Sequence, residues 1–145
     1  MNAEVHAAVS FSLSLAVWFL TKSFIGASLC FFSGIIPDID HIIEFLMHYH
    51  WRDFSLRRLF EECRLTGKGK EGGFKKLRLF FHSMELCFLL IIAAFITKNI
   101  YVASIALGYA SHMILDAIAN PIRASGYFIV KRLFVKFDTD KLMKG

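Results

Sequence analysis

Long runs of apolar residues alternate with short polar breaks along the chain, and four runs are long enough for helices. They cover residues 5–21, 23–36, 79–97 and 100–118. Runs of this length exceed a typical β-strand, so each predicts a helix. About 20 apolar residues cross the hydrocarbon core of a bilayer, which makes the second run short for a full span. The pattern predicts an all-α protein built on a membrane-embedded bundle of four apolar helices.

A polar stretch, residues 51–78, separates the second and third runs. Its apolar residues recur at helical spacing with charged residues between them: Leu56, Leu59, Phe60 and Cys63. This spacing predicts an amphipathic helix that lies on a membrane surface or caps the bundle. The glycine-rich residues 66–73 that follow predict a flexible loop, because they lack the Lys-Ser/Thr pair of a phosphate-binding loop.

The basic residues are distributed unevenly in a chain that is unusually apolar. Hydrophobic residues make up 56% of the 145 residues, and the formal net charge is +5. Of the 17 Lys and Arg, Lys22 and Lys98 lie in two tight breaks, whereas the other 15 lie in residues 51–78 and the tail, residues 122–145. The positive-inside rule then predicts an inner (cytoplasmic) membrane protein whose basic loop and both termini face the cytoplasm. Membrane lipid is therefore the expected partner of these charges, and nucleic acid is not.

The N-terminus and the cysteines bear on processing and redox chemistry. Residues 1–6 contain an acid and no Lys or Arg, so we expect the first apolar run to be retained rather than cleaved as a secretory signal. Cys30, Cys63 and Cys87 are odd in number and form no CxxC pair, which predicts reduced thiols. The length suits a single domain, residues 1–145, whose basic tail is expected to be interfacial.

Histidines and acids gather at the ends of the apolar runs that alternating helices would bring to one side of a membrane. These candidate metal ligands are His6, Asp38, Asp40, His41, His82, Glu85, His112 and Asp116. His112 and Asp116 are four residues apart, and His82 and Glu85 are three apart, so each pair would share a helix face. Asp38 and His41 would do so if a new helix begins at Pro37.

Imidazoles together with carboxylates predict one or two divalent metal ions, with zinc the first expectation and manganese or iron as alternatives. A charged group at mid-membrane costs about 2.5–3.5 kcal/mol on insertion scales, so a neutralising cation is expected. Ordinary structural roles remain open: an intrahelical hydrogen bond for His112, a pairing between helices for Glu85, a polar helix start for His6 and a cap for Asp40. Three further residues are expected at the surface or interface: Glu44, His48 and His50.

At these residues the chain resembles the inner-membrane metal-dependent hydrolases, small multi-helix proteins of which some are described as LexA-binding. The matched motifs are the early His6, "PDIDH" at 37–41, "LRLFFHS" at 77–83, and G-x-x-x-H-x-x-x-D at 108–116. In the third motif Leu77 and Phe81 replace the family's His and Thr, and the Trp-Pro stretch that follows the fourth motif is absent. The spacing is also similar to that of the zinc-dependent phospholipase C enzymes, all-helical proteins whose metals are held by His, Asp and Glu.

The resemblance implies a membrane-bound hydrolase that acts on an ester or phosphoester, with phospholipids as the expected class of substrate. Glu85 or Asp40 would then be the general base, and Arg78 would grip a phosphate or carboxylate oxygen. Two other functions remain open. One is a non-catalytic membrane protein that binds or transports metal, and the other is a membrane-anchored interaction protein that docks a partner through residues 51–78.

Overall fold

The structure is a computed structural model that describes residues 3–67, 74, 76, 78–120 and 122–143. Every regular element among these residues is a helix or a 3-10 turn, and isolated bridges join Lys76 to Asp138 and Ile122 to Met143. The all-α prediction is therefore confirmed. Most of the predicted glycine-rich loop, residues 68–73, lies outside the described residues, as does Leu77 of the third motif.

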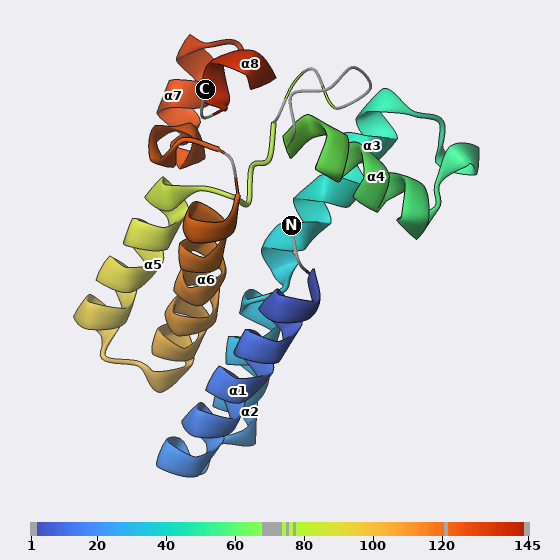
Figure 1. Ribbon diagram of the computed structural model, residues 1–145. Helices are drawn as coiled ribbons and strands as arrows, with labels where there is room; N and C mark the ends of the chain where they lie inside the picture. The colour runs from blue at the N-terminus through green and yellow to red at the C-terminus, as the bar shows by residue number, and fades with distance from the viewer. Residues whose placement is uncertain (1–2, 68–73, 75, 77, 121, 144–145) are drawn as a thin grey trace. The chain divides into compact units, whose positions relative to one another are not determined.

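The chain folds as two compact units. The apolar unit comprises Asn2–Pro37 and Met84–Asp116, and the polar unit comprises Asp38–Ser83 and Ala117–Gly145. The apolar unit holds α1 (Ala3–Thr21), α2 (Phe24–Ser33), α5 (Met84–Thr97) and most of α6 (Ile100–Ala119) (Figure 1). The polar unit holds α3 (Ile39–His48), α4 (Leu56–Gly67), α7 (Ile129–Phe134), α8 (Thr139–Leu142) and the 3-10 turns η2 (Trp51–Asp53) and η3 (Ala124–Tyr127). A further 3-10 turn, η1 (Ile36–Asp38), joins the two units in the chain.

Two tight turns in the apolar unit are built in the same way. Lys22 and Lys98 adopt left-handed backbone conformations, with φ of 54° and 49°, and thereby reverse the chain after α1 and α5. The next residue in each turn caps the following helix. The Ser23 hydroxyl accepts the N–H of Gly26 at 3.1 Å, and the Asn99 side chain accepts the N–H of Tyr101 at 2.8 Å. Such caps satisfy helix N–H groups that have no carbonyl partner within the helix.

Small residues allow the helices of the apolar unit to approach closely. A Cβ atom at Gly108 on α6 would overlap the carbonyl oxygen of Cys30 on α2. A Cβ atom at Gly34, just after α2, would overlap the side chain of Ser10 on α1. Close backbone contact at small residues is a common way to pack helices in apolar surroundings. It brings the end of α2 against α6 one turn before His112.

Two helices are long and apolar enough to cross a membrane, over Glu4–Thr21 and Ile100–Ala119. The other two predicted apolar helices also form, but α5 has 14 residues and α2 has 10. The third predicted run is helical only from Met84 onward, so residues 79–83 form a turn rather than a helix. The number of candidate spans among the described residues is therefore two rather than four.

The polar unit has its own small hydrophobic core. The buried members are Phe45, Leu59, Phe74, Leu79 and Leu142. The C-terminal tail, predicted to be interfacial, contributes Leu142 to this core, and the Thr139 hydroxyl donates to the carbonyl of Phe74 at 2.7 Å. Cys30 and Cys87 are buried free thiols and Cys63 is a half-buried one.

Candidate metal centres

Six of the eight predicted ligands lie in two groups of three, and each group lies within one unit. The His112 site consists of His6, His112 and Asp116 in the apolar unit. The His82 site consists of Asp38, His41 and His82 in the polar unit. In each group, one ligand atom from every residue lies within 4.8 Å of the others. Each group could therefore hold a metal ion through nitrogen and oxygen ligands.

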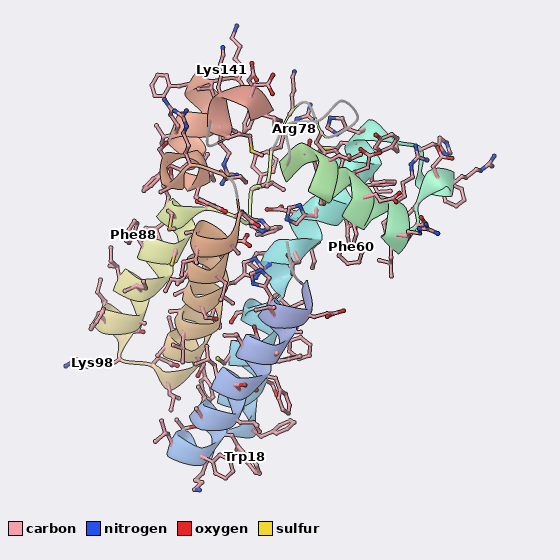
Figure 2. The ribbon with its side chains drawn as sticks, in the orientation of Figure 1. Trp18, Phe60, Arg78, Phe88, Lys98 and Lys141 are labelled. Atoms are coloured by element: carbon pink, nitrogen blue, oxygen red, sulfur yellow. The ribbon has the colours of Figure 1, made fainter. Side chains whose placement is uncertain are left out.

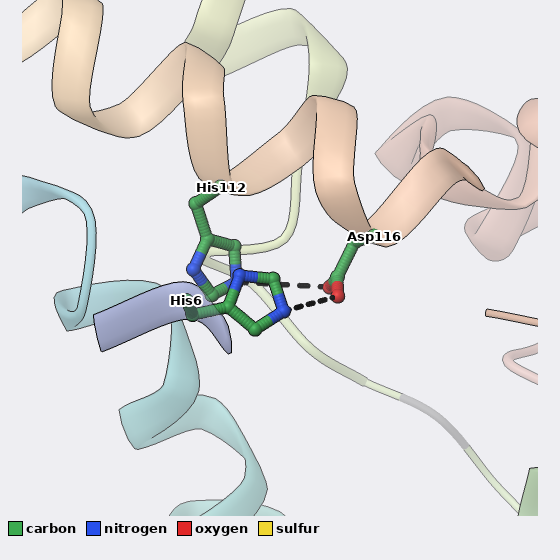
Figure 3. A group of neighbouring side chains, drawn as sticks. All are labelled: His6, His112 and Asp116. Carbon is green, nitrogen blue, oxygen red and sulfur yellow. Dashed lines mark ion pairs between the residues drawn. The ribbon is translucent and has the colours of Figure 1, made fainter. Parts of the chain in front are cut away.

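The His112 site is almost completely buried. His112 and Asp116 lie one turn apart on α6, as their spacing predicts, and His6 comes from the start of α1 (Figure 3). The Nε2 atom of His6 lies 3.1 Å from Asp116 Oδ1, and that of His112 lies 3.6 Å from Asp116 Oδ2. The two imidazole rings stack with centroids 4.2 Å apart. The exposed fractions are 3% for His6 and 1% for His112 and Asp116.

The hydrogen bond behind His112 determines what its inner nitrogen can do. The Nδ1 atom lies 2.8 Å from the carbonyl oxygen of Gly34. Because a carbonyl can only accept, Nδ1 carries the proton, and in the neutral ring Nε2 then presents a lone pair. That lone pair faces the Asp116 carboxylate, which is also an acceptor. Two acceptors that face each other need a proton or a metal ion between them, and a proton on either residue would serve as well as a metal. A simple intrahelical hydrogen bond from neutral His112 does not fit this arrangement.

His6 is part of the buried site rather than a polar helix start. Its Nε2 atom faces Asp116, and its Nδ1 atom is buried with no hydrogen-bond partner among the described residues. An unsatisfied buried polar atom costs about 1–3 kcal/mol. A ring placed at a helix start for its polarity alone would turn this nitrogen to solvent. The ring is therefore placed by the contact of its Nε2 atom with Asp116, within the buried group.

The His82 site is organised by Asp40. The Asp40 Oδ2 atom accepts the backbone N–H of Phe81, the N–H of His82 at 3.0 Å and the ring Nδ1 of His82 at 3.2 Å. A carboxylate on Nδ1 fixes the tautomer and makes Nε2 the coordinating nitrogen, as is common behind metal-bound histidines. The same bonds hold residues 81 and 82 in a turn. The prediction that His82 and Glu85 share a helix face is therefore wrong.

His41 is held against His82 on one side and Cys63 on the other. The two imidazole rings meet edge to face with centroids 4.9 Å apart. The His41 Nδ1 atom lies 3.7 Å from Cys63 Sγ. Burial raises the pKa of the Cys63 thiol to about 12, which favours the neutral thiol over the thiolate. The helix that begins beside Pro37 brings Asp38 within reach of His41, as the spacing predicts.

The other predicted site residues lie outside both groups. Asp40 is the acceptor behind His82, and Glu85 is half-buried in the first turn of α5. Arg78 lies in an extended segment, where its N–H donates to Glu44 Oε2 at 3.1 Å and its guanidinium contacts Met47 Sδ at 3.2 Å. The expectation of a surface position is wrong for Glu44, which is 1% exposed. Its carboxylate accepts the N–H of Arg78, and burial raises the pKa of this carboxyl.

One buried side chain near the His82 site was missed by sequence reasoning. Arg132, on α7, is 2% exposed, and its five N–H groups donate to five backbone carbonyls. Nε reaches Gly126 at 2.7 Å, and the two terminal nitrogens reach Arg78, Leu79, His82 and Tyr127. Arg132 thereby fixes the turn that carries His82. Nothing in the sequence distinguishes it from the neighbouring basic residues of the tail.

Comparison of the chain with protein-family models, with curated proteins and with solved structures gave no match. The resemblance to membrane-bound hydrolases therefore stays a prediction that rests on the motifs alone. What the chain can do must be argued from its two groups of ligands.

Proposed function

We propose that the protein is a membrane-bound, metal-dependent hydrolase of esters or phosphoesters, with a phospholipid as the expected class of substrate. The observation that carries the proposal is the His112 site. There, two histidine nitrogens and a carboxylate converge in a buried position, and the hydrogen bond from His112 to Gly34 leaves a lone pair directed at Asp116. Such a donor set fits a divalent ion of the zinc, manganese or iron type.

His6, His112 and Asp116 would hold one ion, and Asp38, His41 and His82 would hold a second. When bound, a divalent metal supplies a water-derived nucleophile at neutral pH. Asp40 keeps His82 in the tautomer that coordinates through Nε2. Because Asp40 Oδ2 already accepts three N–H groups, we assign the role of general base to Glu85 rather than Asp40. Arg78 remains the candidate for binding an anionic oxygen.

The proposed location is the inner membrane, with α1 and α6 as spans and α2 and α5 packed as shorter apolar helices of a four-helix bundle. His6 lies at the start of one candidate span, and His112 and Asp116 lie in the last turns of the other. If these two helices cross the bilayer in opposite directions, their ligands belong to the same face. The positive-inside rule makes this face cytoplasmic, together with both termini.

Elemental analysis and hydrolysis assays of the same detergent-purified preparations test this proposal. The full chain would be compared with His112→Ala, with Asp116→Asn and with His50→Ala, a control that changes an exposed histidine outside both groups. We expect wild type and the control to retain zinc, manganese or iron after dialysis and to hydrolyse a chromogenic phosphodiester or phospholipid vesicles. Hydrolysis should be lost in the two site variants, together with the share of the bound metal that the His112 site holds.

The other outcomes distinguish the rival functions. Metal bound without turnover of any ester, together with metal flux into liposomes, would assign the site to transport. Metal-free wild type whose thermal stability is unchanged by added zinc or by a chelator would overturn the metal site. That result would favour a membrane-anchored interaction protein.

A further inference from the structure

The predicted apolar stripe of α4 is divided between two surfaces. Leu59 is 3% exposed and packs in the core of the polar unit, with Cys63 beside it. Leu56 and Phe60, one turn apart on the adjacent flank, are 60% and 44% exposed. The helix therefore carries more apolar surface than its own core uses. A helix with two apolar flanks is suited to a second contact along the outer one.

The segment just before α4 extends this exposed surface. Trp51, in η2, is 66% exposed, and Phe54 is 38% exposed. Together with Leu56 and Phe60 they place four large apolar side chains within ten residues, and we call this set the Trp51 patch. None of the four belongs to the buried core cluster of the polar unit, and of the four Phe54 meets the ring of the core residue Phe45 edge to face, with centroids 5.7 Å apart.

We propose that the Trp51 patch inserts into the headgroup region of the lipid bilayer, an inference that rests on the proposed membrane location. Tryptophan and phenylalanine beside arginine are characteristic of peptide surfaces at this boundary, because the rings enter the acyl edge while the guanidinium stays with the phosphates. The Arg52 guanidinium lies over the Trp51 ring at 5.4 Å, and Arg57 is exposed on the first turn of α4.

The charges around the Trp51 patch indicate which interaction would hold it at the bilayer. Asp53 and Glu61 are exposed beside Arg52 and Arg57, so acids and bases are balanced here. Insertion of apolar side chains is therefore the main attraction, and anionic lipid strengthens it only moderately. A bilayer is favoured over a protein partner because the chain passes directly from α2 into the polar unit and returns to it after α6. If α1 and α6 span the membrane, these connections keep the patch at a high local lipid concentration.

The two tryptophans of the chain allow a direct test, because Trp51 reports on the patch and Trp18 reports on the candidate span α1. The full chain with Trp18→Phe, and separately with Trp51→Phe, would be reconstituted into phosphatidylcholine bilayers with and without phosphatidylserine. Lipids brominated at shallow or deep acyl positions would serve as quenchers. We expect the emission of Trp51 to be blue-shifted and quenched most strongly by shallow bromines, in both lipid mixtures.

A charge-matched pair of variants separates insertion from net charge. In the Trp18→Phe background, the double substitution Leu56→Glu with Phe60→Glu should abolish most of the quenching of Trp51. Lys141→Glu changes the net charge by the same amount at an exposed position on α8 and should leave the quenching unchanged (Figure 2).

The outcomes also separate this inference from the proposal on which it rests. Solvent-like, unquenched Trp51 together with quenched Trp18 would overturn the inference and leave the span intact. Absence of quenching at both positions would overturn the membrane location as well. Quenching of Trp51 that survives the double glutamate substitution would show that Leu56 and Phe60 do not insert, and would also overturn the inference.

Discussion

We expect replacement of Arg132 to lower the stability of the polar unit more than substitution of any exposed residue on the same helix, α7. The guanidinium donates to five backbone carbonyls, and the side chain is 2% exposed, so Arg132→Met removes one donor from each while roughly preserving volume. Of the five, the Leu79 carbonyl still accepts the N–H of His82 at 3.3 Å. Each carbonyl that stays dry costs about 1–3 kcal/mol. Because water can reach some of these carbonyls, we expect the free energy of unfolding to fall by on the order of 5 kcal/mol. A typical domain is stable by only about 5–15 kcal/mol, so this is a large part of the total.

Two further variants calibrate this loss. Lys131→Met changes the exposed neighbour of Arg132 on α7 and should cost less than about 0.5 kcal/mol. Arg132→Lys keeps the charge but offers three donors on one nitrogen instead of a planar fork, so it should recover part of the loss. Because the turn that binds Arg132 carries His82, Arg132→Met should also weaken zinc binding at the His82 site, whereas Lys131→Met should not.

Urea unfolding of the detergent-purified full chain measures these differences. Trp51 lies in the polar unit and Trp18 in the apolar unit, so a Trp18→Phe background makes fluorescence report on the polar unit. We expect the midpoint of the Trp51 transition to fall in the order wild type, Arg132→Lys, Arg132→Met. Equal midpoints for Arg132→Met and Lys131→Met would refute the reasoning, because they would mean that the five carbonyls find equivalent partners without the guanidinium.

Three more substitutions test separate contacts. Gly108→Ala should lower the melting temperature and the metal content of the His112 site. Gly26→Ala should have a smaller effect in the same melts, because its Cβ would meet only the hydroxyls of Ser104 at 3.2 Å and Ser23 at 3.4 Å and the Cβ of Ser23 at 3.5 Å. Asp40→Asn should weaken zinc binding at the His82 site about 10–100-fold in a chelator competition, with an unchanged circular dichroism spectrum. Burial raises the pKa of Glu44, so the folded state favours its protonated form and stability falls as pH rises above the usual value of 4.5. Urea midpoints should therefore favour Glu44→Gln over wild type increasingly from about pH 4.5 upward, and a constant difference across pH would contradict this.

The elements that depend on local pattern could be predicted from the sequence. All four apolar runs form helices, and the spacing of His112 and Asp116 places both on one face of α6. The start of α5 could not be predicted in the same way. Residues 79–83 are apolar enough to continue the helix, but Asp40, far away in sequence, accepts the N–H groups of Phe81 and His82. A long-range carboxylate thus overrides a local propensity.

Arg132 shows a second limit of sequence reasoning. Its partners are backbone carbonyls, and a carbonyl is present at every position whatever the side chain. No residue type at Leu79, His82 or Tyr127 therefore indicates that an arginine binds there. The division of the α4 stripe has the same origin, because periodicity identifies apolar positions but does not say that Leu59 enters the core while Leu56 stays outside.

The two candidate metal sites show the same difference between what residue type reveals and what it does not. The inward-facing ligands are histidines and acids, and chemistry alone suggests them. The groups behind the histidines are of three different kinds: a carbonyl at Gly34, a carboxylate at Asp40 and a thiol at Cys63. Each lies beside Nδ1, and in the first two cases it accepts the ring proton, which directs the Nε2 lone pair inward. Because several unrelated groups can do this, no single motif marks them, yet they determine whether a histidine can bind metal. The strongest argument for metal at the His112 site is thus the backbone carbonyl of Gly34, which turns His112 from a hydrogen-bond donor to Asp116 into a potential ligand.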